Sequence, residues 1–100
     1  MMGSAHSPSD IHLTSEWMMS LDNLNKVLRH DLDRRTITVQ AGMRLYQYLK
    51  ELEKRGWSMD NLGSISDQSI AGAIATCTHG SSLKHGPISA QVFLLMNCIN

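Results

Sequence analysis

The chain has 100 residues, of which 42% are apolar and 18% charged, and its nine basic and nine acidic side chains cancel. This length allows one domain at most. The zero net charge removes the electrostatic argument for a nucleic-acid partner or an anionic membrane surface. A charged share below the usual value of about 25% indicates that much of the surface is meant to be covered.

Neither a signal peptide nor a membrane-spanning segment is predicted. The N-terminus lacks the charged and apolar regions of a signal peptide, and no apolar run reaches the roughly 18 residues that a spanning helix needs. Cys77 and Cys98 show no CxxC spacing, so a reducing compartment is the expected environment.

The chain opens with a loop and a short strand. Residues 1–10, MMGSAHSPSD, have the composition of a loop. Farther along, Trp17, Met19 and Leu21 occupy alternate positions. This spacing predicts a strand over residues 17–21 with these three side chains on one face.

A β-hairpin is predicted next, from residues 27–32 and 35–41. In its second strand Ile37, Val39 and Ala41 alternate with polar residues, and the β-branched content favours a strand. The intervening sequence DLDR is typical of a turn between two strands.

Residues 43–54 form the clearest predicted helix. Its apolar side chains recur at the spacing i, i+4, i+7, which predicts one buried stripe. Gly56 is expected to end the helix in the left-handed conformation. The stripe consists of Leu45, Leu49 and Leu52.

Residues 61–86, NLGSISDQSIAGAIATCTHGSSLKHG, are rich in Gly, Ser and Thr. The small apolar residues of the 69–77 run predict a short helix, with Ser66 or Asp67 as its N-cap. Free backbone N–H groups at such a helix start are a natural anion site. This favours a phosphate- or pyrophosphate-binding loop. An ordinary Gly/Ser loop between core elements explains the composition equally well, because a glycine-rich loop alone is a weak signal.

The last predicted element is a strand over residues 92–96, which are continuously apolar. That pattern is typical of a strand buried on both faces. The predicted order is loop, strand, hairpin, helix, loop, small helix and strand, which indicates an α+β fold.

Three segments together resemble one protein family: residues 3–10 (GSAHSPSD), 37–42 and 61–86. The aldonolactone oxidases, flavoenzymes with an FAD-binding domain of the vanillyl-alcohol-oxidase (PCMH) type, carry a GxGHSPSD loop and a similar SIAG…THGSS…HG run. The pairing of these two motifs is far more specific than either glycine pattern alone. The resemblance covers essentially the whole chain and implies a partial PCMH-type FAD-binding domain.

The resemblance also implies which residues contact FAD. His6 stands where the family has the histidine that carries the flavin covalently, through the 8α-methyl group of the isoalloxazine ring. The other implied contacts are Gly3, Ser4, Ala5 and Ser7 at the pyrophosphate, Gly63, Ser64 and Ser66 on the cofactor's other side, Gly72 at a close backbone approach, and Thr76, Thr78, His79 and Gly80 against the FAD.

Two positions depart from the family pattern. Ala5 stands where the family usually has glycine, and Cys77 stands in place of the glycine of a TGTHG motif. Where the backbone needs a positive φ, a non-glycine residue is strained.

The implied function is oxidation of a sugar lactone at a CH–OH group, with FAD as cofactor and O₂ as acceptor, giving H₂O₂ and a product on the route to erythroascorbate. Family members sit at mitochondrial membranes, so that location is expected. No residue is assigned to catalysis. Residues 1–100 are expected to be a fragment of the FAD-binding domain, without its N-terminal part and the substrate domain, and inactive toward the lactone by themselves.

Other interpretations compete with this one. The length is also compatible with a truncated, non-catalytic FAD- or nucleotide-binding relic. Cys77, His79 and His85 have poor spacing for zinc, so no metal site is predicted. Ser64 or Ser66 with His79 lacks the G-x-S-x-G elbow of a hydrolase, and that chemistry is rejected.

Overall fold

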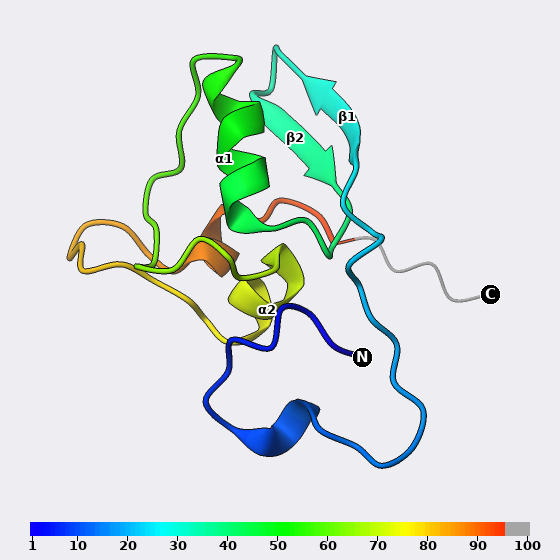
Figure 1. Cartoon of the computed structure of the whole chain (residues 1–100). Coiled ribbons are helices and arrows are strands. Elements are labelled where there is room, and N and C mark those ends of the chain that lie inside the picture. The colour runs from blue at the N-terminus through cyan, green and yellow to red at the C-terminus, as the bar shows by residue number, and fades with distance from the viewer. Residues whose placement is uncertain (96–100) are drawn as a thin grey trace.

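The computed structural model describes residues 1–95. Its elements are the 3₁₀ turn η1 (Asp10–His12), strands β1 (Val27–Asp31) and β2 (Thr36–Val39), helices α1 (Leu45–Glu53) and α2 (Ile70–Ala75), and the 3₁₀ turn η2 (Ile88–Gln91). Figure 1 shows α1 beside the β1–β2 hairpin, with the N-terminal segment running past α2. The predicted α+β class is confirmed.

The hairpin forms where the sequence predicts it. Its strands are antiparallel, and Asp31 pairs with Thr36 next to the turn. The Asp31 carboxylate accepts a hydrogen bond from the Arg34 N–H at 3.0 Å, which is the usual way in which an Asp side chain stabilises a turn. Arg35 then has a φ of 52°, so the chain enters β2 through one left-handed residue.

Helix α1 lies inside the predicted range and ends as predicted. The Trp57 N–H donates to the Leu52 carbonyl at 3.0 Å, and the Gly56 N–H donates to the Glu53 carbonyl at 2.9 Å. These two bonds form a Schellman motif, which requires a left-handed residue just past the helix. Gly56 supplies it with a φ of 67°.

The core lies where α1, α2 and η2 meet. Leu45, Ala73 and Ile88 are 1%, 0% and 3% exposed and form one cluster. Of the predicted leucine stripe, Leu45 and Leu52 are buried and Leu49 is half-buried. The partly buried side chains packed against the cluster are Met59, Ile70 and Ile74.

The predicted strand over residues 17–21 is wrong. Trp17 is fully exposed, and of the three side chains on the predicted buried face only Leu21 is buried. Within residues 1–95 the segment pairs through a single isolated bridge, in which Met2 donates its N–H to the Met19 carbonyl and accepts from the Leu21 N–H. One bridging residue does not make a sheet face, so the alternating side chains have no surface to cover.

The predicted buried strand over residues 92–96 is also wrong where the structure describes it. Residues 92–95 form no strand, and Phe93, Leu94 and Leu95 are exposed. Met96 lies outside the described residues. A strand buried on both faces needs a covering layer on each side, and residues 1–95 place none there.

The Gly56→Ala variant is expected to lower the free energy of unfolding by about 1 kcal/mol, because a Cβ disfavours the left-handed conformation. An added Cβ meets no atom within 4 Å at this position, so no clash contributes. Urea unfolding measures the change. Gly56→Asn should lose less, since Asn tolerates positive φ better than Ala, and an alanine variant as stable as the wild type would contradict the assignment.

Candidate functional site

A cavity of about 220 Å³ lies between the N-terminal loop and the start of α2. It brings together every predicted residue of the loop with two predicted residues of the α2 region. The loop contributes Gly3, Ser4, Ala5, His6, Ser7 and Pro8, the α2 region contributes Gln68, Ser69, Gly72 and Thr76, and His12 completes the lining.

The loop is fastened to the N-cap of α2 through Ser69. The Ser69 N–H donates to the Ser4 Oγ at 2.9 Å, and Ser69 is only 1% exposed. Gly3 passes so close that an added Cβ would lie 2.1 Å from the Ser69 Oγ. Glycine at position 3 is therefore required by a close backbone approach.

Within residues 1–95 the backbone N–H groups of residues 3–7, which line this cavity, have no protein partner. Ala5 has a φ of 55°, and a left-handed residue in a loop allows successive N–H groups to converge on one anion. The loop is therefore suited to bind a phosphate group.

The predicted N-cap of α2 is wrong. The cap is Ser69, whose Oγ accepts from the Gly72 N–H at 3.4 Å, and not Ser66 or Asp67. Ser69 forms an isolated antiparallel bridge with Arg44. Because the chain is extended there, the helix begins only after it.

The predicted free N–H groups at the start of α2 are also absent from this part of the described chain. The Ile70 N–H donates to the Met43 carbonyl, and the Ala71 N–H donates to the Ala41 carbonyl, each at 2.9 Å. Residues 41–43 thus occupy the donors that a bare helix start offers to an anion.

The predicted Gly63, Thr78 and Gly80 form a second group beside the cavity. A Cβ on Gly63 would lie 2.9 Å from the Thr78 Cγ2, and one on Gly80 would lie 2.2 Å from the Asn61 Oδ1. The hydroxyls of Thr76 and Thr78 are 3.4 Å apart, which connects this group to the cavity. The glycines therefore allow two loop segments to pack closely.

The other predicted residues, Ser64, Ser66 and His79, are exposed and do not line the cavity. The Ser66 carbonyl accepts from the Tyr46 N–H at 2.9 Å. The His79 Nδ1 lies 2.8 Å from the Gly80 carbonyl oxygen. Their presence in the site stays a prediction.

Helix α2 ends at Ala75, and Cys77 follows it in a second Schellman motif. The Thr78 N–H donates to the Ala73 carbonyl at 3.0 Å, and the Cys77 N–H donates to the Ile74 carbonyl at 3.3 Å. Cys77 has a φ of 55°, as Ala5 does. Both departures from the family pattern therefore stand at positions that favour glycine.

The sequence patterns did not single out four of the lining residues. Ser69 carries a usable signal, because a serine just before a small apolar run is a typical N-cap. His12 and Gln68 belong to no chemical motif, so only the fold places them at the cavity, and Pro8 lies in the HSPSD loop without an assigned role.

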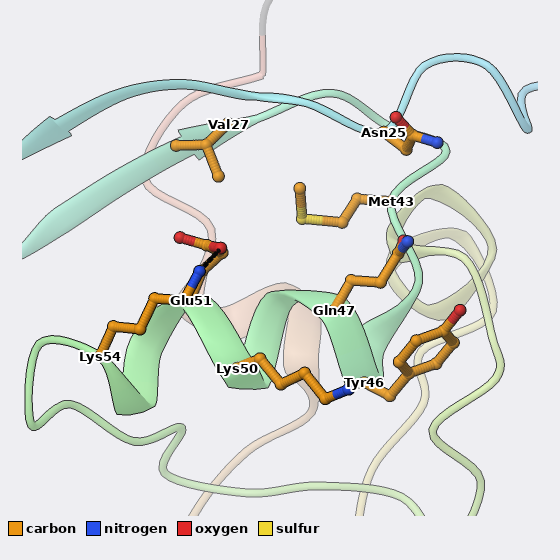
Figure 2. Close-up of a pocket in the computed structure, with 8 residues that line it drawn as sticks. All are labelled: Asn25, Val27, Met43, Tyr46, Gln47, Lys50, Glu51 and Lys54. Atoms are coloured by element: carbon orange, nitrogen blue, oxygen red, sulfur yellow. Dashed lines mark hydrogen bonds and ion pairs between the residues drawn. The ribbon is translucent and has the colours of Figure 1, made fainter.

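A second cavity, of about 420 Å³, lies between α1 and the hairpin (Figure 2). Hydrogen bonds from Lys54 and Arg55 hold the pKa of the Glu51 carboxyl below its usual value. The charge of Glu51 is therefore paired on its own helix. No predicted site residue lines this cavity, whose walls are Asn25, Val27, Met43, Tyr46, Gln47, Lys50, Glu51 and Lys54.

Between residues 1 and 95, no cluster of three or more His, Cys, Asp and Glu side chains is arranged to hold a metal ion. Over the same residues, every helix is too short or too polar to cross a membrane.

The FAD binding domain family matches residues 1–95 of the chain. The chain belongs to this family. Its relatives include the D-arabinono-1,4-lactone oxidases of Yarrowia lipolytica, Saccharomyces cerevisiae and Kluyveromyces lactis, which are 50%, 51% and 49% identical over 98, 94 and 94 residues. The resemblance seen in the sequence is thereby confirmed.

This FAD binding domain chain is much shorter than those relatives. The three alignments cover 94%, 90% and 90% of the chain but only 19%, 18% and 18% of the relatives. The chain therefore spans less than a fifth of the length of the curated relatives it matches.

Ser4→Ala in the loop of residues 3–7 is expected to lower the free energy of unfolding by about 1–3 kcal/mol, because it leaves the buried Ser69 N–H without its acceptor. Hydrogen exchange over residues 3–7 should accelerate as well. Ser7→Ala is the matched control, since the Ser7 Oγ contacts only the exposed Ser9 hydroxyl. Equal behaviour of the two variants would show that the Ser4 hydroxyl does not fasten the loop.

Cys77→Gly is expected to raise the free energy of unfolding by up to about 1 kcal/mol, because glycine relieves the strain of the left-handed conformation. Part of this gain is lost, since glycine also gives the unfolded chain more conformational freedom. FAD affinity should not fall. Cys77→Ala keeps the Cβ and the strain, so it should not show the gain. If the glycine and alanine variants both lose FAD affinity in a titration, the thiol makes a favourable contact and the expectation is wrong.

Proposed function

We propose that this chain is the FAD-binding part of an oxidase that acts on D-arabinono-1,4-lactone, with O₂ as electron acceptor and H₂O₂ as product. Relatives about half identical over nine-tenths or more of the chain carry that name. Bound FAD would supply the two-electron acceptor for oxidation of a CH–OH group. The observation that carries the proposal is the set of unpaired N–H groups in the GSAHS loop, held against α2.

The pyrophosphate of FAD fits the loop of residues 3–7. Its oxygens are acceptors, and the unpaired N–H groups are the donors that they need. The close approach of Gly3 to Ser69 fixes the loop before any ligand arrives. We propose that Gly72 and Thr76 of the α2 region lie between the loop of residues 3–7 and a second group of residues on the other side of the cofactor. That second group consists of Gly63, Ser64, Ser66, Thr78, His79 and Gly80.

His6 is the proposed point of covalent attachment. Its ring is exposed at the cavity, and within residues 1–95 neither ring nitrogen has a hydrogen-bond partner. A ring nitrogen would thus be free to replace one hydrogen of the 8α-methyl group. The electron pair of the broken C–H bond would pass to the flavin and then to O₂, and the protons would leave to solvent. The His79 Nδ1, by contrast, is engaged by the Gly80 carbonyl at 2.8 Å.

The substrate, the mitochondrial-membrane location and the route to erythroascorbate are proposals that rest on the family resemblance and on the relatives' names. The chain alone is expected to show no lactone-dependent peroxide formation. A non-catalytic FAD- or nucleotide-binding relic would use the same loop, so FAD binding supports both interpretations and covalent attachment favours the oxidase.

His6→Ala is expected to abolish acid-stable flavin. Wild-type chain incubated with FAD should keep flavin fluorescence after acid precipitation, and the variant should lose it while still binding FAD reversibly. His30→Ala, at an exposed histidine of β1, is the control. Acid-stable flavin in the His6 variant would refute the attachment point, and a wild-type chain that binds no FAD at all would refute the proposed function.

A further inference from the structure

Two buried polar atoms of the FAD cavity lack a hydrogen-bond partner within residues 1–95. They are the Gln68 Oε1 and the His12 Nδ1, and both residues line the cavity. The great majority of buried polar atoms in folded proteins are paired, because leaving one unpaired costs free energy. Two such atoms at one cavity point to a ligand that pairs them.

The hydroxyl groups of the same cavity are already engaged. The Ser4 Oγ accepts from the Ser69 N–H at 2.9 Å, the Ser69 Oγ accepts from the Gly72 N–H at 3.4 Å, and the Thr76 Oγ1 donates to the Gly72 carbonyl at 2.8 Å. Gln68 and His12 are therefore distinguished from these residues because each has a buried side-chain atom without a partner within residues 1–95.

The backbone of Gln68 is held on both sides of the residue. Its carbonyl accepts from the N–H of the buried Leu45 at 2.9 Å, and the next residue, Ser69, is bonded to the loop. The Gln68 Oε1 lies 3.9 Å from the position that a Cβ would take on Gly63. Gln68 thus reaches from the cavity toward the second group of predicted residues.

We infer that Gln68, together with His12, binds hydroxyl groups of the bound dinucleotide next to its pyrophosphate. This inference rests on the proposed FAD site. Pyrophosphate oxygens only accept hydrogen bonds, so they do not pair with the Gln68 Oε1. A hydroxyl donates to this oxygen, and it pairs with the His12 Nδ1 in either tautomer.

The two atoms are closed to solvent and reach a ligand by rotation of the side-chain end. The terminal torsions of Gln and His have broad, roughly two-fold profiles. We expect a turn about these torsions to bring the Gln68 oxygen or the His12 nitrogen to the cavity, while the anchored Gln68 backbone stays in place. These atoms are unpaired in the ligand-free chain and paired in the complex. The free energy gained by pairing them therefore favours binding.

The cavity accepts part of the dinucleotide. Its volume of about 220 Å³ is below the roughly 300 Å³ at which ligand pockets for drug-sized molecules begin. FAD has a polyol unit on each side of its pyrophosphate: the ribityl chain toward the flavin and the ribose toward the adenine. Both offer the hydroxyl chemistry that Gln68 requires.

The test is a titration of the full chain with FAD. Gln68→Met keeps the length of the side chain and removes the acceptor, so the affinity should fall on the order of tenfold, the usual effect of one hydrogen bond. The thermal midpoint of the ligand-free variant should stay the same or rise, because an unpaired buried atom is gone. A merely structural role would lower the midpoint instead.

Gln47→Met is the matched control, since the Gln47 Oε1 accepts from the Arg44 N–H at 2.9 Å away from the FAD cavity. It should lower the midpoint and leave the FAD affinity unchanged. His12→Phe should weaken FAD binding, while His30→Phe, at the exposed histidine of β1, should not.

FMN and ADP, used as competitors of FAD, identify the polyol. If Gln68→Met weakens FMN alone, the residue binds the ribityl chain, and if it weakens ADP alone, it binds the ribose. An unchanged FAD affinity of Gln68→Met would overturn the inference and leave the proposed function intact. Failure of the wild-type chain to bind FAD would overturn both.

Discussion

The backbone ladder between residues 41–46 and 66–71 is the constraint on which the rest of this structure depends. Both helices begin from it, so their starts are held at a fixed distance. It is buried, because Met43 and Leu45 are 3% and 1% exposed. Its four hydrogen bonds, each 2.9 Å long, join Tyr46 to Ser66, Leu45 to Gln68, Ile70 to Met43 and Ala71 to Ala41.

This ladder decides where the site can bind an anion. It occupies the N–H groups at the start of α2, which a short helix following a Gly/Ser loop would otherwise offer. Within residues 1–95 the N–H groups of residues 3–7 donate to no protein acceptor, and that loop is joined to the ladder through Ser69. The binding function therefore depends on a contact between segments far apart in the sequence, and such a loop opens more readily than the core it lies on.

The sequence predicted the elements whose signals are local. The hairpin turn at Asp31 and the end of α1 at Gly56 depend on neighbouring residues alone, and both are confirmed. The prediction of a strand over residues 17–21 was wrong because a strand needs hydrogen-bonded partner strands, which the alternation of apolar side chains does not reveal. The predicted N-cap of α2 was wrong because the ladder, which pairs segments far apart in the sequence, keeps the chain extended as far as Ser69.

The candidate site divides in the same way. The family resemblance identified the loop around His6 together with Gly72 and Thr76, and the structure brings them to one cavity. The sequence did not predict Gln68 and His12 as site residues, because no motif includes them. They are assigned to the site because each has a buried side-chain atom without a hydrogen-bond partner within residues 1–95. Unpaired buried atoms are a property of packing, which a pattern of residue types does not encode.

The two strained residues of the site have different physical origins. The left-handed conformation of Cys77 belongs to the end of α2, where α1 uses Gly56 in the same motif. That strain lowers stability without serving the cavity. The left-handed conformation of Ala5 lies inside the loop of residues 3–7, at the wall of the cavity.

Ala5 adopts this conformation in the ligand-free chain, so the free energy of unfolding carries its strain and the binding equilibrium does not. A glycine at position 5 would relieve the strain but widen the range of conformations the loop visits. Under the proposed function, the alanine thus exchanges stability for a loop already shaped to receive a phosphate group, whereas Cys77 makes no such exchange.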